Sequence, residues 1–577
     1  MSRMKKLHGL SGSGVLFKPI FYIVLILLLI SLLVACSPAA TTQAPTSNTS
    51  ATSTATPATT GTADPKPQGE LVAALQGFGS ENFLPWLDPK FATPQLLIYD
   101  MLIYWDHINH NFLPGLAESW EVSEDGMTTT YHLRKGVQFT DGWGELTSAD
   151  VAYDFAMHRS LESLGKTEVH RRVASTDEPD PYTLIVHMKT PYPTFFADLS
   201  MANSGVSQGI VCKKYIETVG TELASQKPIG SGPFRLVESK LGSYYKFEAL
   251  DSHWRVVPEF KNITIRLLPE ISSYVAGLKN QEIDLSEVSP EQILDLKASG
   301  LAVEVNPVGG SILNLSLGGM VIPQDKYYDA AYHNKDPWVD SRVRKAMAIA
   351  IDREAICKAI YAGYADPAGV PLLTLDSQKY QYAYDPAQAR QLLKDAGYPD
   401  GFSFKAISNV NPLSAEAPRV IEAVCGYWEQ IGIKPKIVNI DYATYLNTHI
   451  IPRKTAGEVY LTPINTIADQ LAKYEASFIP GVTNLSYQDA AEYAIYEAMP
   501  KNASFDERNK VVAQINQYFY DNVGPIPVAR TSRCFAWNPA KIGPWPHIEA
   551  AQPLYLEYVR HAQPHNTFRL FNIWPGR

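Results

Sequence analysis

The sequence predicts an α/β protein whose body divides into two or more lobes. From residue 70 onward, short runs typical of strands alternate with longer runs of helical periodicity. Residues 70–577 exceed what one hydrophobic core usually serves. A helical run that ends at Gly432 leads directly into the strand-like run KPKIVNI, which is the order of an α/β unit.

The chain opens with a basic segment followed by an apolar run. Four Lys or Arg residues and no acidic residue precede Cys36, and Phe21–Ala35 carries no charge. This is the pattern of a signal peptide, and the run is shorter than the about 20 residues of a comfortable membrane span. We expect residues 1–35 to be a signal peptide; an uncleaved signal anchor is the alternative.

A cysteine ends the apolar run, and a polar tract follows it. The residues Leu33-Val34-Ala35-Cys36 resemble a bacterial lipobox, in which the cysteine is acylated and becomes the new N-terminus. The tract from Ser37 to Gly69 is nearly all Ser, Thr, Ala and Pro, so it buries too little surface to offset chain entropy. We expect residues 36–69 to be a lipidated cysteine and a disordered spacer that tethers the body to a membrane.

Charge and cysteine content exclude some classes of function. The formal net charge is −9, and loss of the four basic residues before Cys36 would make it −13, which argues against nucleic acid as a partner. The remaining cysteines are Cys212, Cys357, Cys425 and Cys534. Their wide spacing gives no metal signature and leaves any disulfide pairing open. We expect no cofactor and no metal.

The first half of the body reads mainly as strands. Glu70–Leu75 is a strand that ends before Gly77, and Thr183–Lys189 is another. The run around Tyr131 alternates apolar and polar residues, and the runs FRLVES and YYKFEAL form a hairpin across residues 240–242. Ser148 is expected to cap a helix that runs to about Ser160.

The second half carries long helical patterns. The run SRVRKAMAIAIDREAICKAIYAG has apolar residues at helical spacing and ends at Gly363. We expect Arg344 and Asp352 to form ion pairs on this helix. Asp385 and Pro386 begin another helix, which Gly397 ends.

Five stretches, taken together and in order, resemble one known family. They are LAESWEVSEDGMTTTYHLRKGVQFTDGW (116–143), IGSGPFRLVES (229–239), VRKAMAIAIDREAICKAIYAGYADPA (343–368), YDPAQARQLLKDAGYPDGF (384–402) and WEQIGIKPKIVNIDYATY (428–445). This order is similar to that of the extracellular solute-binding proteins of ABC importers, in the oligopeptide, dipeptide and nickel-binding group (family 5, cluster C). The resemblance covers most of residues 70–545.

The resemblance implies a two-lobe periplasmic-binding-protein type II fold with a hinge and an extra subdomain on the first lobe. The implied boundaries are 70–100, 229–320 and 525–577 for lobe I, 101–228 for the extra subdomain and 321–524 for lobe II. A peptide or other small polar solute would be enclosed in the cleft as the lobes close. The expected partners are the solute, ABC permease subunits and the membrane through Cys36. The protein is expected to be a monomer on the outer face of the cell membrane, and not an enzyme.

Six residues are candidates for solute contact. In peptide-binding relatives an aspartate holds the peptide amino group, and Asp469 is the best match here, although the neighbouring tryptophan of the family pattern is absent. The alternative is that Asp469 caps a helix from about Gln470 to Ser477. The loop after the first strand should face the cleft, because ligand sites in α/β sheets lie beyond the carboxyl ends of the strands. That loop supplies Phe78, Ser80, Glu81 and Trp86, and Asn314 lies near the crossover between the lobes.

Two alternative interpretations assign the protein to other functional classes. A secreted hydrolase would use Ser207, since Gly205–Gly209 fits G-x-S-x-G, but the preceding run is not a clean apolar strand. The run HINH at residues 107–110 hints only weakly at a metal. A non-transport solute sensor would have the same binding fold, and adjacent genes for permeases and ATPases would distinguish it.

Overall fold

The computed structural model describes residues 66–88, 91–106, 111–160, 172–192, 194–200, 209–306, 310–374, 376–410, 414–466, 469–482, 487–543, 556 and 559–562. The predictions for Cys36, for the spacer as far as residue 65, for the HINH run and for Ser207 fall outside these residues. Residues 66–69, predicted to end the disordered spacer, are instead bonded to the body, where the Gln68 N–H donates to the Glu259 carbonyl at 2.8 Å. Residues 64–577 form one compact unit.

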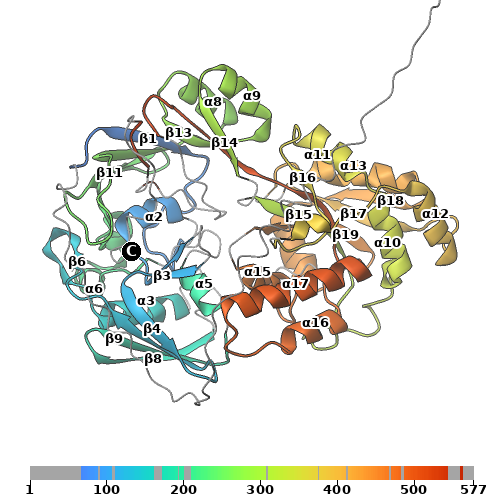
Figure 1. Cartoon of the computed structure of the whole chain (residues 1–577), viewed down its shortest axis with the longest axis horizontal. Helices are drawn as coiled ribbons and strands as arrows, with labels where there is room; N and C mark the ends of the chain where they lie inside the picture. The colour runs from blue at the N-terminus through green and yellow to red at the C-terminus, as the bar shows by residue number, and fades with distance from the viewer. Residues whose placement is uncertain are drawn as a thin grey trace, which may run out of the picture. The chain divides into compact units, whose positions relative to one another are not determined.

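The first large sheet has seven strands in the order β10-β11-β12-β1-β13-β21-β14 (Figure 1). β1 runs parallel to β12 and β13, so the carboxyl ends of these three strands meet at one edge. β10 and β11 form the predicted antiparallel hairpin. The strands are β1 (Glu70–Leu75), β10 (Phe234–Lys240), β11 (Tyr244–Ala249), β12 (Asn262–Leu267), β13 (Leu285–Val288), β14 (Ala302–Asn306) and β21 (Arg533–Trp537).

The second large sheet has six strands in the order β16-β20-β15-β19-β17-β18. β17 is parallel to β18 and β19, whereas β15 is antiparallel to both β19 and β20. The strands are β15 (Ser311–Leu317), β16 (Asp366–Pro367), β17 (Ser403–Ser408), β18 (Lys434–Asn439), β19 (Glu458–Asn465) and β20 (Ile526–Arg530).

A four-stranded antiparallel sheet, β4-β5-β9-β8, is formed by the chain between β1 and β10. Its buried side chains belong to the same apolar cluster as those of the seven-stranded sheet, whereas the six-stranded sheet has a separate cluster. The small sheet is therefore attached to the first large sheet through a shared core. The further strands here are β2 (Ile103–Asp106), β3 (Asn111–Pro114), β4 (Ala117–Val122), β5 (Thr128–Leu133), β6 (Gln138–Phe139), β7 (Gly144–Glu145), β8 (Val173–Asp180) and β9 (Thr183–Met188).

The helices cover the sheets and connect their strands (Figure 1). The helices that follow the first strands are α2 (Ala92–Ile98), α3 (Ser148–Arg159), α5 (Phe195–Leu199), α6 (Lys213–Val219), α7 (Thr221–Gln226), α8 (Ile271–Lys279) and α9 (Ile293–Ala298). Those inserted between strands of the six-stranded sheet are α10 (Ser341–Ile349), α11 (Arg353–Ile360), α12 (Pro386–Asp395), α13 (Ala417–Glu429), α14 (Tyr442–Tyr445), α15 (Gln470–Ser477), α16 (Ala490–Glu497) and α17 (Phe505–Asn522). Among the residues that the structure describes, none of the helices combines the length and apolar character that a membrane span requires.

The chain crosses between the two large sheets at two places that lie side by side. One crossing joins β14 to β15, and the other joins β20 to β21 through only Thr531 and Ser532. The Thr531 N–H donates to the Ser311 carbonyl at 2.8 Å, and the Ser311 N–H donates to Thr531 Oγ1 at 2.9 Å. Gly310 packs directly against the Thr531 backbone, where a Cβ would overlap the carbonyl oxygen.

These crossings also show which strands belong to which sheet. β15 and β20 fall within the ranges 229–320 and 525–577 that the resemblance assigns to lobe I, yet both pair in the six-stranded sheet. One crossing therefore lies between Asn306 and Ser311, and the other between Arg530 and Arg533, rather than at the implied boundaries near residues 320 and 525. We propose the same division into two lobes, with the chain passing from one lobe to the other at these crossings.

Three predictions about helices were wrong in detail. The helix predicted through Gly363 is broken after Ile349, because Asp352 caps a new helix, α11, and its carboxylate accepts the Ala355 N–H at 2.9 Å. Arg344 is buried and donates to backbone carbonyls, including that of Val523 at 2.6 Å, rather than to a carboxylate. α3 begins at Ser148, but its cap is Thr147.

The four cysteines of the body are buried free thiols. Burial raises the pKa of Cys212 to about 11 and the pKa values of Cys357, Cys425 and Cys534 to about 12, so all four remain protonated near neutral pH.

The paired crossings predict a strong effect of a small change. Gly310→Ala should lower the free energy of unfolding by about 1–3 kcal/mol, because the new methyl group forces the two crossings apart. Gly426→Ala is the matched control, since a Cβ there has no atom within 4 Å and alanine favours the helix α13. Thermal melts of both variants measure the effect; equal melting temperatures would contradict it.

Candidate functional site

A cavity of about 360 Å³ lies at the carboxyl ends of β1 and β13, beside the crossings between the two large sheets. The chain after β1, the start of α2, the end of β13 and the crossing before β21 line it from one side. Glu416, which precedes α13 of the other sheet, lines it as well. We refer to this cavity, lined by residues 74–77, 91, 93, 94, 286–290, 532–534 and Glu416, as the interlobe cleft.

A matched ion pair lies in the interlobe cleft. Arg533 Nε donates to Glu287 Oε1 at 2.8 Å, and Arg533 Nη2 contacts the second carboxylate oxygen. The side chain of Arg533 is 11% exposed and that of Glu287 is 36% exposed. Because the guanidinium also lies 4.9 Å from the centre of the Phe535 ring, two side chains, Glu287 and Phe535, hold it in place.

Uncharged polar groups and one further carboxylate complete the cleft. Gln76, Thr93, Ser286 and Ser289 line it. Ser286 Oγ donates to the Ala74 carbonyl at 3.2 Å, which links the ends of β13 and β1. With Glu287 matched by Arg533, Glu416 gives the cleft a surplus of negative charge.

The loop after β1 holds four of the predicted contact residues, and the structure packs most of it inward. Phe78 lies edge-on to Tyr245, with ring centres 5.2 Å apart, and Trp86 is 1% exposed beside Tyr153. The Ser80 N–H donates to the Asp88 carboxylate at 2.6 Å. Gly77 and not these side chains lines the interlobe cleft.

Glu81 ties this loop to the hairpin of β10 and β11. Its carboxylate accepts the Gly242 N–H at 2.9 and 3.0 Å and the Tyr245 hydroxyl at 2.8 Å. Glu81 itself has a positive φ of 58°, a conformation uncommon for a residue with a side chain. These contacts support a structural role for the loop.

Asn314 is fully buried in β15. Its Nδ2 donates to the Ile312 carbonyl at 3.1 Å, while Oδ1 is buried with no hydrogen-bond partner among the described residues. The residue lies next to the crossings, as predicted, but inside the sheet and away from the lining of the interlobe cleft.

Asp469 caps α15, which spans the predicted residues Gln470–Ser477. Its Oδ1 accepts the Leu471 N–H at 3.2 Å, and its Oδ2 accepts two bonds from Arg508 at 2.9 and 2.7 Å. Both side chains are at least 96% buried. To hold a solute ammonium group, Asp469 would have to exchange Arg508 for the solute.

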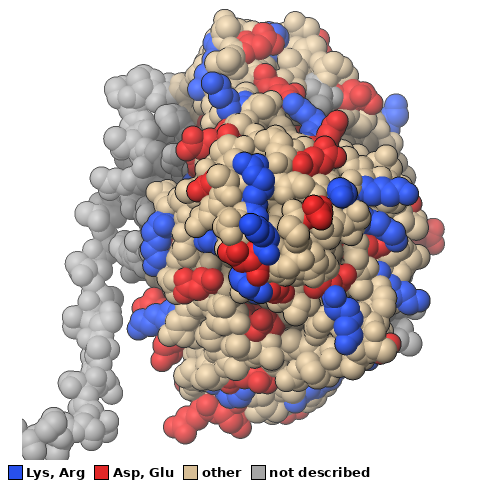
Figure 2. All heavy atoms as spheres, turned by 90° about the vertical axis from the view of Figure 1, so that its right-hand side faces the viewer, with Lys and Arg blue, Asp and Glu red and all other residues tan. Residues whose placement is uncertain are grey.

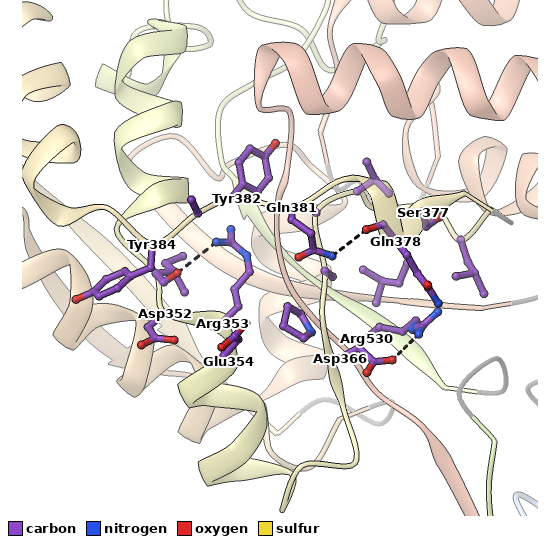
Figure 3. Close-up of a pocket in the computed structure, with 18 residues that line it drawn as sticks. Asp352, Arg353, Glu354, Asp366, Ser377, Gln378, Gln381, Tyr382, Tyr384 and Arg530 are labelled. Carbon is purple, nitrogen blue, oxygen red and sulfur yellow. Dashed lines mark hydrogen bonds and ion pairs between the residues drawn. The ribbon is translucent and has the colours of Figure 1, made fainter. Parts of the chain in front are cut away.

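A larger cavity of about 850 Å³ is lined by residues between Ile351 and Tyr384, with Ile312 and Arg530 (Figure 3). Figure 3 shows Arg353 and Tyr384 on one side of it and Gln378 with Arg530 on the other. Arg353 donates to the Pro527 carbonyl at 2.8 Å, and burial lowers its pKa to about 10. All of these residues belong to the chain around the six-stranded sheet, so movement of one lobe against the other would not enclose this cavity.

On the face that Figure 2 shows, and among the described residues, no feature indicates a nucleic-acid or metal site. On the face in Figure 2, basic and acidic side chains are interspersed rather than gathered by sign. Within the described ranges, no group of three or more His, Cys, Asp or Glu is placed to hold a metal ion.

Sequence reasoning missed Glu287, Arg533 and Glu416. Glu287 and Arg533 are 246 positions apart, and only the pairing of β13 with β21 brings them together. The sequence carries one indication of such residues. The strand that ends at Val288 has polar residues before a turn, as the first strand does.

Comparisons with known proteins agree with this architecture. Residues 111–474 match the model of the bacterial extracellular solute-binding proteins, family 5 Middle. The dipeptide-binding protein of Escherichia coli K12 is 29% identical over 414 residues, which is 65% of this chain and 72% of that protein. The glutathione-binding protein GsiB of Salmonella paratyphi A is 30% identical over 331 residues, which is 56% of this chain and 60% of that protein.

Solved structures share the fold at lower sequence identity. NikA of Brucella suis in complex with Fe(III)-EDTA has a TM-score of 0.70 and 19% identity, covering 86% of this chain and 100% of its own. DppA of Helicobacter pylori in complex with the peptide STSA has a TM-score of 0.65 and 22% identity, covering 86% of this chain and 99% of its own.

The buried pair of Asp469 and Arg508 generates a prediction. Asp469→Asn should lower the free energy of unfolding by about 3–5 kcal/mol, because it leaves a buried guanidinium unmatched. Asp506→Asn, at an exposed position of α17, is the control. Chemical denaturation measures both. An unchanged stability, with a selective loss of affinity for amine-bearing solutes, would instead assign Asp469 to ammonium binding.

Proposed function

The chain is a member of the bacterial extracellular solute-binding proteins of family 5, and from this premise we propose that it captures a peptide or other small polar solute and delivers it to an ABC permease. The observation that carries the proposal is the interlobe cleft. It lies at the carboxyl ends of parallel strands, where α/β folds bind ligands, and both large sheets contribute to its lining.

The size and charge of the cleft favour a small polar solute. Its volume of about 360 Å³ lies at the low end of ligand pockets. A matched ion pair offers both a donor and an acceptor, and Glu416 adds an acidic group, so a solute with an amine or several hydroxyl groups is complementary. Relatives and structural neighbours include proteins named for dipeptide and glutathione binding and one solved with a metal chelate.

Solute binding rather than catalysis is the character of the family. The hydrolase alternative that would use Ser207 is not favoured, since the match to the family model spans that position. A sensor that binds the same solute without a transporter remains a distinct role for the same cleft. Adjacent genes for two permeases and two ATPases would support transport.

We also propose that the protein is exported as a monomer and anchored to the outer face of the cell membrane. The family is extracellular, and the signal-like run ending at Cys36 supports acylation at that residue. The spacer before residue 70 would let a tethered protein reach and turn toward its permease.

Thermal-shift screening of residues 64–577 tests the binding function directly. Di- and tripeptides, oligosaccharides and metal chelates form the panel, and a true ligand at 100 times its Kd should add about 2.7 kcal/mol of stability. Mass spectrometry of solute that co-purifies with the protein provides an independent identification. Absence of any shift, together with cleavage of ester or peptide bonds, would overturn the proposal.

Gly77 allows the cleft to be blocked without disturbing the fold. A Cβ at Gly77 has no atom within 4 Å, so Gly77→Trp should fill the interlobe cleft and weaken solute binding at least tenfold while the melting temperature without solute is retained. Gly77→Ala is the matched control and should bind normally. Isothermal titration with the solute from the screen measures both; full affinity in the tryptophan variant would place the site elsewhere.

Acylation has its own test. Cys36→Ser should abolish incorporation of an alkynyl fatty acid and leave the protein with its signal sequence uncleaved. Labelling that persists in the variant would show that the junction has another role.

A further inference from the structure

The chain around the small sheet and the chain around the six-stranded sheet are in contact through Thr194 and Glu475. Thr194 immediately precedes α5, and Glu475 lies on α15. Thr194 Oγ1 donates to Glu475 Oε2 at 2.6 Å, and both residues are buried. The two residues are 281 positions apart in the chain, so this bond joins the part that shares its core with the seven-stranded sheet to the part around the other sheet.

Other contacts show that the two parts meet over a patch. The rings of Trp105 on β2 and Phe505 on α17 are 4.9 Å apart. A Cβ at Gly126 would lie 3.1 Å from the carbonyl oxygen of Lys501. In Figure 1, α5 is next to α15 and the start of α17, away from the crossings that join the two large sheets. Opening about those crossings would separate this patch.

Glu475 lies in a buried pocket of hydroxyl donors. Its Oε1 accepts the Tyr496 hydroxyl at 2.6 Å, so each carboxylate oxygen has one such donor. Burial raises the pKa of Glu475 to about 7, against the smaller opposing effects of Thr194, Tyr496 and Arg172. Burial in the closed form, and not the hydrogen bond from Thr194 itself, therefore keeps Glu475 mostly protonated below about pH 7.

The charged and titratable neighbours come from every element packed around Glu475. Asp469 on α15 raises its pKa slightly, but Arg508 of α17 matches the charge of Asp469. Arg172, from the small sheet, lies over the Tyr192 ring at 4.3 Å. On α16, Tyr493 and Tyr496 are titratable only at high pH, because burial raises their pKa values.

Glu492 is a further buried carboxyl group near this patch. Burial raises its pKa to about 8. It is fully buried on α16 beside Tyr474, which belongs to the same lobe, so opening would leave its surroundings unchanged. Glu475 is distinguished by having a partner on each side of the boundary.

We propose that Glu475 is a proton-operated latch, in which closure of the two parts transfers its side chain from water into contact with Thr194 and takes up one proton. The proposal rests on the opening and closing implied by the proposed function, and it adds a control by pH. The closed form is then favoured as the pH falls, and each proton taken up comes from the surrounding solution.

The direction follows from the two protonation states. In water Glu475 has its ordinary pKa of 4.5, and in the closed form its pKa is about 7. Below pH 4.5 the side chain is protonated in both forms, and pH has no effect. Between pH 4.5 and about pH 7, each increase of one pH unit shifts the equilibrium between the closed and open forms up to tenfold toward the open form. Above about pH 7 the effect is complete.

Distance measurement between two labels tests the latch without any solute. Glu178 on β8 and Lys510 on α17 are exposed, whereas the four cysteines of residues 64–577 are buried, so Glu178→Cys and Lys510→Cys would carry the spin labels. Pulsed dipolar spectroscopy from pH 5 to pH 8 then reports the closed and open populations. We expect the open population to grow as pH rises, with the steepest change below about pH 7.

Three variants distinguish protonation of Glu475 from other causes of a pH response. Glu475→Gln, which resembles the protonated acid, should remove most of the pH response and be at least tenfold more closed than the parent at pH 8. Glu497→Gln, at an exposed position of α16, is the control and should respond as the parent does. Thr194→Val keeps the carboxylate but removes its donor across the boundary, so it should be more open throughout.

The outcomes distinguish failure of the latch from failure of the proposed function. A pH response that persists in Glu475→Gln, or a closed population that grows with pH in the parent, would overturn the latch while leaving solute binding untouched. If Glu475→Gln does not fold, a Thr194→Val variant with parental populations would overturn it equally. Because no solute is present, a failed solute screen has no bearing on the result.

Discussion

The pair of chain crossings at Gly310 and Thr531 is the constraint on which the rest of the structure depends. Two passages that are hydrogen-bonded to each other behave as a short ribbon, because a single strand could twist freely whereas a bonded pair bends mainly in one direction. Thr466 reinforces the ribbon, since its N–H and hydroxyl both donate to the Gly310 carbonyl at 2.9 and 3.0 Å. Movement between the two large sheets is thereby directed rather than random.

The position of the interlobe cleft follows from that constraint. Ser532 and Arg533 continue directly from the ribbon into its lining, so bending there changes the position of the charged pair relative to Glu416. Two buried carboxylates away from the interlobe cleft are matched within one part and do not oppose this movement. Asp100, although its burial acts to raise its pKa, is held ionised by His253 and Arg255, and Arg508 matches Asp469. These matched groups keep each part rigid.

The sequence predicted local features well and spatial pairing poorly, for a physical reason. β1, the cap of α12 at Asp385 and the alternative of a helix at Gln470–Ser477 depend on neighbouring residues, so their signals are contained in short windows. The break at Asp352 was missed because apolar spacing continues across it. Glu287 and Arg533 were missed because their contact exists only through strand order, which no local pattern encodes.

The crossings and the Thr194–Glu475 contact both restrict the movement between the two parts. They differ in their response to pH. The ribbon is made of backbone bonds and uncharged side chains, so its energy is independent of pH. The carboxyl group of Glu475, by contrast, accepts hydrogen bonds from hydroxyl groups on both sides of the boundary. Under the proposed function, a solute would add its contact energy at the interlobe cleft. Closure would then depend on a fixed elastic term, a solute term and a proton term, of which only the last two change with the solution around the protein.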